Sequence, residues 1–498
     1  MEKKKNLVYI PTGLNSPELE ILLSKSQILI DKKKSVTIVV CSGGKNYYCS
    51  KNIYSIKSIC ILCKNLRNKG ISKLKGNFKL LRTPSIIQAN ERGKIFNYEK
   101  LIKEKYKNFD IGYGVYASYV AATRDMELES INASYICSRL LNTSKILSKY
   151  FENLLNTKQF DHVVLYNGRM NQYRPLFRIT QNKKINVSNM EFSGSNNQTY
   201  DFKNFFSMDL NNLSKKINFF WKKKKKKTLN KNELIKFFSD RFNDSAKLRS
   251  KSFVSKQDSD LLPGNWNKNK INIVYYSASN DELISYGKEY SLGYYQNQNN
   301  IFYKLAKTLQ KKDFSSYNLW IRMHPNLSNL RWSFVRSLGE INKNFKNVFV
   351  IPPESKISTY KLMIKADIIM GTSSSFTLAE ANHLGKPTIA VGPNIWNKIG
   401  VSITPKNHND LEKIIKNFKF KKINSRNSLK YAAFRMYGGF QIKYLTGDKN
   451  YNYYFNNYSI KLDNIHKIFY FLAKIKEKLI TKIFFNNIFN LKYRATFK

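Results

Sequence analysis

The sequence contains no apolar run long enough to cross a membrane, because none of its hydrophobic stretches reaches the roughly 20 residues that a spanning helix requires. It also shows no signal peptide at its start. Met1 is followed by Glu-Lys-Lys-Lys and then by a short strand-like segment, residues 6–11, where a signal peptide would have a longer apolar region. These two absences predict a protein that is made and kept in the cytosol.

Acidic residues are scarce. The 498 residues include 34 Asp and Glu against 86 Lys and Arg, which gives a formal net charge of +52. Such a charge favours polyanionic partners, either nucleic acid or an anionic membrane face. The alternative is that most lysines simply lie on solvated faces. No nucleic-acid recognition motif or localised basic stripe is present, so we expect no specific nucleic-acid partner.

Cysteine is also rare, and five thiols in a cytosolic chain argue against a disulfide framework. Four of them nevertheless fall close together, and closely spaced thiolates can complete a tetrahedral zinc site. Only two of the four have the CxxC spacing, so reduced, partly buried thiols are the favoured interpretation and a structural zinc is the less favoured one. The four residues are Cys41, Cys49, Cys60 and Cys63.

The length of the chain exceeds what one hydrophobic core usually supports, so we expect two main domains. Near the N-terminus, a strand, a helix opened by Ser16-Pro17-Glu18 and the β-branched run 36–40 indicate a βαβ unit. Five further strands alternate with helical segments between residues 271 and 391, which is typical of a doubly wound parallel sheet. Two such domains are expected to face each other across a cleft.

The predicted fold class is therefore α/β, with two Rossmann-like doubly wound domains and a C-terminal helical extension. The expected divisions are an N-terminal Rossmann-like domain at 1–205, a basic linker at 206–268, a second Rossmann-like domain at 269–415, and C-terminal helices at 416–498.

Two strand ends of the second domain carry groups suited to binding phosphate. Strand 319–323 runs into His324, and the alternation of side chains puts Arg322 and His324 on the same side, where both can donate to phosphate oxygens. A histidine satisfied by the backbone is the alternative. Strand 367–370 is followed by a turn rich in serine that opens a helix, where free N–H groups and the helix dipole favour an anion. Its serines are Ser373, Ser374 and Ser375.

Those serines have two other interpretations. A purely structural N-cap remains open. A nucleophilic serine is disfavoured, because the segment lacks the GxSxG pattern and His383 lies well along the helix.

Several other polar residues follow strands. Glu380, one turn into the helix after the serines, could accept hydrogen bonds from ribose hydroxyls or could be an ordinary exposed glutamate. Asp281 and Glu282 follow the first strand of the second domain, where paired carboxylates suit general-base work and helix capping is the alternative. In the first domain, the loop after strand 162–166 places Asn167 and Arg169 at the expected cleft.

Four segments of the sequence resemble those of a known family. The segments "SASNDELISYG", "IRMHPNL", "STYKLMIKADIIMGTSSSFTLAEANHLGKPTIAVGP" and "LYNGR" are similar to those of GT-B glycosyltransferases, in particular bacterial capsule and surface polysaccharide biosynthesis proteins. The pairing of a His-Pro strand end with a serine-rich strand end is also similar to bacterial sialyltransferases, Kdo transferases and teichoic-acid polymerases.

The resemblance implies that His324 and the three serines hold the phosphate of a CMP-, CDP- or UDP-linked sugar donor, with Glu380 near the ribose and no cofactor required. It leaves the catalytic base open. The acidic motif of the sialyltransferases lies in the first domain, so Asp110 and Glu191 stand beside Asp281 and Glu282 as candidates. The resemblance also implies that the domain at 269–415 binds the nucleotide sugar and that the domain at 1–205 is on the acceptor side.

The predicted function is that of a glycosyltransferase that moves a sugar from a nucleotide-activated donor to a growing surface polysaccharide or lipid-linked glycan, without a metal and with inversion at the anomeric carbon. Three alternatives remain: a polyol-phosphate transferase of the teichoic-acid type, a nucleotide-sugar epimerase, and a non-catalytic polysaccharide assembly or export factor.

The C-terminal segment suggests a partner. Residues 465–494 place an apolar stripe among lysines, and a basic amphipathic helix can lie on an anionic membrane face, which would suit a lipid-linked acceptor. Packing of this helix against the first domain is equally favoured. The expected location is thus the cytoplasm, with peripheral attachment to the inner face of the membrane. The stripe consists of Ile465, Ile468, Phe469, Leu472, Ile475, Leu479 and Ile483.

Overall fold

The computed structural model describes residues 4–44, 46–85, 94–193, 198–225, 229–243, 254–279, 286–287, 293–295, 297–330, 332–372, 375–417, 424–448 and 452–486. The chain forms two compact units. The first comprises Met1–Ser207, Ser285–Gly287 and Gly439–Asn490, and the second comprises Met208–Ile284, Lys288–Gly438 and Leu491–Lys498.

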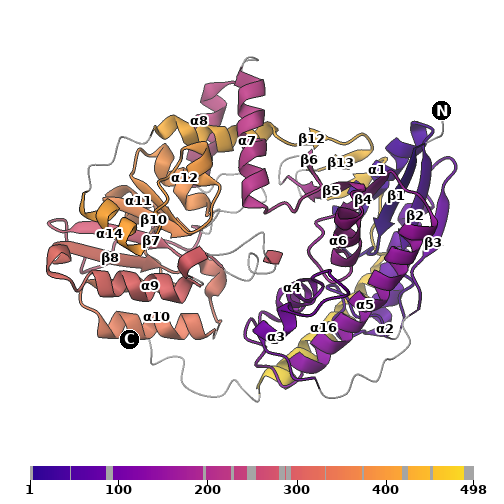
Figure 1. The fold of residues 1–498 in the computed structure, drawn as a ribbon, viewed down its shortest axis with the longest axis horizontal. Helices are drawn as coiled ribbons and strands as arrows, with labels where there is room; N and C mark the ends of the chain where they lie inside the picture. The colour runs from indigo at the N-terminus through magenta and orange to yellow at the C-terminus, as the bar shows by residue number, and fades with distance from the viewer. Residues whose placement is uncertain are drawn as a thin grey trace. The chain divides into compact units, whose positions relative to one another are not determined.

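The first unit is built on a seven-stranded sheet with the order β12-β6-β5-β4-β1-β2-β3 (Figure 1). Its five parallel strands follow the 3-2-1-4-5 order of a doubly wound fold. Two antiparallel strands, β6 and β12, extend the β5 edge. The strands are β1 (Lys5–Ile10), β2 (Ser35–Val40), β3 (Lys79–Arg82), β4 (His162–Tyr166), β5 (Asn186–Phe192), β6 (Gln198–Lys203) and β12 (Phe440–Gln441).

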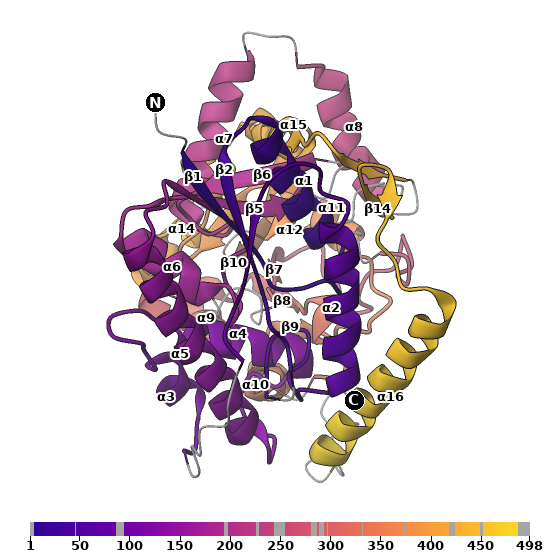
Figure 2. The same cartoon turned by 90° about the vertical axis from the view of Figure 1, so that its right-hand side faces the viewer.

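Helices cover both faces of this sheet. Helices α1 (Glu18–Asp31) and α2 (Lys57–Ile71) lie on one side, while α4 (Gly112–Thr123), α5 (Ala133–Thr157) and α6 (Arg174–Asn182) lie on the other, with α3 (Tyr98–Ile102) against α4 (Figure 2). A small sheet of β13 (Leu445–Gly447), β14 (Tyr453–Phe455) and β15 (Tyr458–Ser459) packs on α1, and α16 (Asn464–Asn486) runs beside α2.

The second unit is built on a five-stranded, wholly parallel sheet with the order β11-β10-β7-β8-β9, again a doubly wound order. Its strands are rich in Ile and Val because both faces are covered by helices. They are β7 (Ile271–Tyr276), β8 (Tyr317–Arg322), β9 (Val348–Ile351), β10 (Ile368–Thr372) and β11 (Thr388–Val391).

Helices α9, α10, α11 and α12 of the second unit lie in the connections between its strands. Helices α7 and α8 precede the sheet in the chain, and α13, α14 and α15 follow it. The helices are α7 (Leu210–Lys225), α8 (Lys231–Phe242), α9 (Gln298–Thr308), α10 (Ser333–Asn344), α11 (Thr359–Lys365), α12 (Phe376–His383), α13 (Trp396–Ile399), α14 (His408–Lys416) and α15 (Ser428–Tyr437).

The predicted fold class, α/β with two doubly wound domains, is confirmed. The division of the chain differs from the predicted one in two places. Residues predicted to form a basic linker include α7 and α8, which belong to the second unit because their aromatic side chains pack there: Phe220 contacts Phe434, and Phe238 stacks on His383 at 4.3 Å. Residues 439–490, predicted as part of a separate tail, belong to the first unit through β12 and α16.

Candidate functional site

The central strand of the second unit brings the predicted phosphate-binding segments to one edge of the sheet. Strand β7 lies between β8 and β10, with Tyr276 paired to Arg322 on one side and to Gly371 on the other. Because the three strands are parallel, their carboxyl ends share an edge. His324 and Ser375 follow the two strands that flank β7 (Figure 1).

The backbone and ring of His324 are held by hydrogen bonds on both sides. Its N–H donates to Ser277 Oγ at 2.9 Å, and its Nδ1 accepts from the N–H of Asn326 at 3.1 Å. Since Nδ1 is an acceptor, the proton of the neutral imidazole lies on Nε2. The ring therefore carries an N–H donor at Nε2, the kind of group that binds a phosphate oxygen.

Ser375 begins helix α12, but its side chain does not cap the helix. The Oγ atom instead lies 2.7 Å from Thr377 Oγ1. The first N–H groups of α12 therefore have no side-chain cap from this residue, as an anion-binding helix start requires. Four other predicted site residues, Ser373, Ser374, Asp281 and Glu282, lie outside the described residues.

A buried glutamine, which the sequence analysis did not single out, ties two of these strand ends together. The amide of Gln298 accepts from Ala278 N at 3.0 Å and donates to Ala278 O at 3.1 Å, which fixes the segment after β7. Thr372 Oγ1, at the end of β10, lies 3.5 Å from the same amide oxygen. Gln298 thus positions the edge at which His324 and Ser375 lie.

Arg322, predicted as a phosphate ligand, makes different contacts. It is 2% exposed, and its Nη1 and Nη2 donate to the carbonyls of Pro352 and Ser355 at 2.9 and 3.1 Å. Burial lowers the pKa of its guanidinium to about 10. The side chain lies inside the unit and holds the loop after β9, so its role is to position that loop.

Glu380, predicted to lie near a ribose, is also internal. It is 1% exposed, and its Oε1 accepts from Arg241 Nε at 2.6 Å and from the Tyr360 hydroxyl at 3.0 Å. The guanidinium of Arg241 lies 3.8 Å from the ring centroid of Phe376. A buried carboxylate must be paired, and here the pairing joins helices α8, α11 and α12.

In the first unit, three predicted residues come together where β4 and β5 end. Asn167, in the left-handed region at φ 60°, donates from Nδ2 to Glu191 Oε2 at 2.5 Å. Burial raises the pKa of the Glu191 carboxyl above its ordinary value, and the hydrogen bond from Asn167 and the charge of Arg169 offset part of that rise. Glu191 therefore has the environment of a general base.

Glu18, a second acid at this edge, was interpreted from the sequence only as part of a helix start. It is 3% exposed, and its carboxylate accepts hydrogen bonds from the Tyr173 hydroxyl and from Asn15 Nδ2. Burial raises its pKa, and its charge helps to raise that of Glu191. Its position in the chain soon after β1, at the carboxyl edge of a parallel strand, is the feature of the sequence that could have identified it as a site residue.

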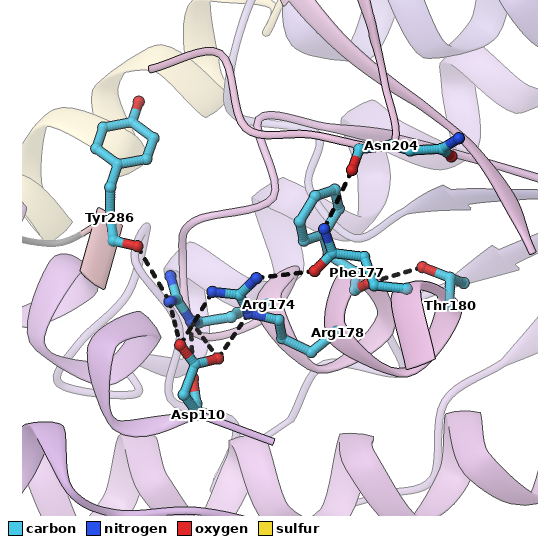
Figure 3. A network of polar contacts seen from close by, with 8 residues as sticks. Asp110, Arg174, Phe177, Arg178, Thr180, Asn204 and Tyr286 are labelled. Atoms are coloured by element: carbon cyan, nitrogen blue, oxygen red, sulfur yellow. Dashed lines mark hydrogen bonds and ion pairs between the residues drawn. The ribbon is translucent and has the colours of Figure 1, made fainter. Parts of the chain in front are cut away.

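Asp110, the other first-domain candidate for the base, is held between two arginines (Figure 3). Arg174 Nη2 lies 2.7 Å from Oδ2, and Arg178 Nε lies 2.6 Å from Oδ1. Burial acts to raise the pKa of Asp110, but the charges and hydrogen bonds of Arg174 and Arg178 together lower it. An ionised carboxylate whose two oxygens are both paired with arginines is a poor base. Of the two first-domain candidates, Glu191 is therefore the better one.

The four clustered cysteines are free thiols that line one pocket of the first unit. Among the residues that the structure describes, no group of three or more His, Cys, Asp or Glu side chains is arranged to hold a metal ion.

Comparison with known proteins finds no matching family model and no match among curated proteins. Several solved structures match across much of the chain. KpsC of Thermosulfurimonas dismutans, a beta Kdo 2,4 transferase, gives a TM-score of 0.34 at 11% identity over 54% of this chain and 79% of that one. UDP-GlcNAc 2-epimerase from Neisseria meningitidis gives a TM-score of 0.25 at 12% identity, over 85% of this chain and 94% of that one. CalG4, the calicheamicin glycosyltransferase, gives a TM-score of 0.27 at 9% identity, over 87% of this chain and 94% of that one.

These matched structures are glycosyltransferases and a nucleotide-sugar epimerase, two of the enzyme classes that the sequence analysis named. At such identities and TM-scores they assign no function to this chain. Its function is therefore argued from its own residues.

The contacts of Glu380 yield a test of its role. Glu380→Ala leaves Arg241 buried without its partner, so we expect the free energy of unfolding to fall by about 3–5 kcal/mol. The double variant Arg241→Met/Glu380→Leu removes both charges and should regain most of that loss. Urea denaturation measures both. A Glu380→Ala protein of unchanged stability with a raised KM for a nucleotide sugar would instead return Glu380 to the predicted ribose contact.

Proposed function

We propose that this protein is a glycosyltransferase that moves a sugar from a nucleotide-activated donor to a glycan acceptor. The observation that carries the proposal is the sheet edge of the second unit, where His324 and the start of α12 flank β7. The Nε2 N–H of His324, after β8, and the first N–H groups of α12, after β10, form a set of donors suited to a diphosphate or phosphodiester.

The chemistry follows from where charge develops. As the bond to the sugar breaks, the nucleotide leaves with additional negative charge on its phosphate oxygens. Donors that are already fixed in place stabilise that charge without reorganising, and the hydrogen bonds of Gln298 and Ser277 hold this edge in place. Because these groups can neutralise the leaving group, the proposed mechanism requires no metal ion.

The acceptor hydroxyl must lose a proton as it attacks. We assign this step to Glu191, whose pKa is raised above its ordinary value, as suits a general base, and whose carboxylate is oriented by Asn167. Direct attack by the hydroxyl on the anomeric carbon inverts its configuration. A surface polysaccharide or lipid-linked glycan is the acceptor that we propose.

Helix α16 supports the membrane part of this proposal. It runs beside α2, yet the six residues of the predicted apolar stripe from Ile465 to Leu479 are exposed there, with exposed fractions from 37% for Ile475 to 67% for Ile465. The side chain of Ile483, the last residue of the stripe, lies outside the described part of the chain. Lysines stand among these residues, and the chain carries a net charge of +52. None of the helices that the structure describes is long and apolar enough to span a bilayer. We propose that this stripe binds the surface of an anionic membrane, where a lipid-linked acceptor would lie.

The donor site is tested with two substitutions at His324. His324→Asn keeps an acceptor near the position of Nδ1 for the Asn326 N–H but removes the Nε2 donor, whereas His324→Ala removes both. A hydrogen bond to a charged group contributes about 1.5–3 kcal/mol, so both variants should bind the donor roughly 10- to 150-fold more weakly. Isothermal titration with CMP-, CDP-, UDP- and GDP-sugars measures this, after a thermal-shift screen has identified the nucleotide.

His324→Asn should also retain the stability of the wild-type protein, which separates donor binding from folding. Unchanged donor affinity in both variants, or no stabilisation of the wild-type protein by any nucleotide sugar, would count against the donor site. Conversion of the donor sugar without an acceptor would favour an epimerase over a transferase.

The role of Glu191 is tested by pH dependence. As a base it acts in its ionised form, so the acid limb of kcat/KM should lie above the ordinary carboxyl value of 4.5. Asn167→Ala removes a hydrogen bond that lowers this pKa, so the limb should move further toward high pH. An unmoved limb would contradict the assignment. Glu191→Gln should abolish most activity.

The same variant has a stability signature. The pKa of Glu191 is raised in the folded protein. Its contribution to stability is therefore fully present below the pKa of the unfolded chain and is lost as the pH rises through the pKa of the folded protein. Glu191→Gln cannot ionise, so the melting temperature of this variant should fall less as the pH rises, which thermal denaturation across the pH range measures.

Membrane attachment is tested by charging the stripe. Phe469→Glu/Leu472→Glu should weaken sedimentation with phosphatidylglycerol vesicles by at least tenfold, because burial of each such side chain contributes about 1.5–3 kcal/mol. Ile364→Glu, an exposed position on α11, is the control and should bind as the wild-type protein does. Equal binding of all three proteins would overturn the role of α16.

A further inference from the structure

The first unit contains a pocket at the carboxyl ends of β1 and β2, next to helix α2. The segments after both strands contribute to its lining, as Pro11 and Cys41 show. Cys60, Cys63, Lys64 and Arg67 come from one helix, and their spacing of three to four residues puts them on the same face of α2. No residue of the lining is acidic, whereas Lys51, Lys64 and Arg67 are basic.

Arg67 is buried in this lining without a counter-ion. Its side chain is 1% exposed, and Nη1 donates to the carbonyl of Pro11 at 3.2 Å. The other two nitrogens, Nε and Nη2, are buried and have no hydrogen-bond partner among the described residues, where Arg67 also forms no ion pair. Burial of a charged group in this state is costly unless something else supplies the missing partner.

The unsatisfied atoms form one edge of the guanidinium. The same edge is occupied in Arg174 and Arg178, whose Nε and Nη2 atoms donate to Asp110 at 2.6–3.3 Å (Figure 3). Two parallel N–H bonds on this edge match two oxygens of a single carboxylate or phosphate. In Arg67 this edge has no such oxyanion from the described part of the chain.

Three of the neighbouring thiols, those of Cys41, Cys49 and Cys60, do not supply the missing negative charge. Burial raises the pKa of Cys41 to about 11 and raises those of Cys49 and Cys60 above the ordinary value, so these thiols are neutral at physiological pH. Three of the sulfur atoms are also used as acceptors. Cys41 accepts from Gly43 N at 3.1 Å, Cys60 from Asn52 Nδ2 at 3.2 Å, and Cys63 from Gly13 N at 3.1 Å.

We propose that this pocket binds an oxyanion, a carboxylate or a phosphate group, on the Nε and Nη2 edge of Arg67. Lys51 and Lys64 add positive charge to the lining, and Tyr47 brings a buried hydroxyl to it. Leu14 and Ile59 provide apolar contacts for the remainder of the ligand. The site involves the first unit alone and does not depend on the function of His324.

The test uses probes that separate the charge from the apolar body. Benzoate and phenyl phosphate carry the two oxyanions, and benzyl alcohol is the neutral control. We expect benzoate, phenyl phosphate or both to raise the melting temperature of the wild-type protein in a saturable manner, and benzyl alcohol to have no comparable effect. The anion that binds more tightly identifies the chemical class of the ligand.

The matched variant is Arg67→Met. It replaces a buried, uncompensated charge with an apolar side chain of similar length, so its melting temperature without ligand should equal or exceed that of the wild-type protein. Its affinity for the binding anion should fall at least tenfold, whereas His324→Asn should bind that anion as the wild-type protein does. Equal responses of wild type and Arg67→Met, or no response of the wild type to either anion, would overturn the proposal.

A second measurement applies even where Arg67→Met does not fold. In the wild-type protein labelled with nitrogen-15 at arginine, titration with the anion should shift the side-chain Nε resonance of Arg67 and leave that of Arg241, which is paired with Glu380, unchanged. An unmoved Arg67 resonance contradicts the site.

Discussion

The pairing of β7 with β8 on one side and β10 on the other is the constraint on which the candidate donor site depends. It makes two segments that are about fifty residues apart in the chain leave the sheet at one edge, with one strand between them. Gln298 then couples the segment after β7 to the end of β10 through one buried amide. The first unit repeats the principle, since β4 lies between β1 and β5 and thereby gathers Glu18, Asn167 and Glu191.

Charge pairing inside both units follows from the shortage of acids in this chain. With 34 acidic residues against 86 basic ones, a buried carboxylate has more cations available than it can satisfy. Asp110 accepts from two arginines, and Glu380 accepts from one arginine and one tyrosine. Arg67 differs from these three arginines, because its Nε and Nη2 atoms have no hydrogen-bond partner among the described residues. A bound anion could supply that partner.

The sequence predicted the local features well. Runs of Ile and Val located the strands of the second unit, and the His-Pro dipeptide marked the end of β8. Roles that depend on distant partners could not be read in this way. Strand alternation predicted that Arg322 and His324 lie on the same side, but only the fold brings the carbonyls of Pro352 and Ser355 to the guanidinium of Arg322. Similarly, the partner of Glu380 lies 139 residues earlier in the chain, in a segment that was predicted to be a linker.

The way in which β12 joins β6 has a consequence for how the protein can be divided. The first unit is assembled from three separate stretches of chain, and its last stretch closes the edge of the sheet at β6. A fragment that ends at Ser207 would lose β12 and expose the backbone N–H and C=O groups of β6 to solvent. An open strand edge of that kind is a template for self-association. Each unit has its own sheet and its own hydrophobic core, but the chain cannot be cut at Ser207 without removing a strand from the first unit.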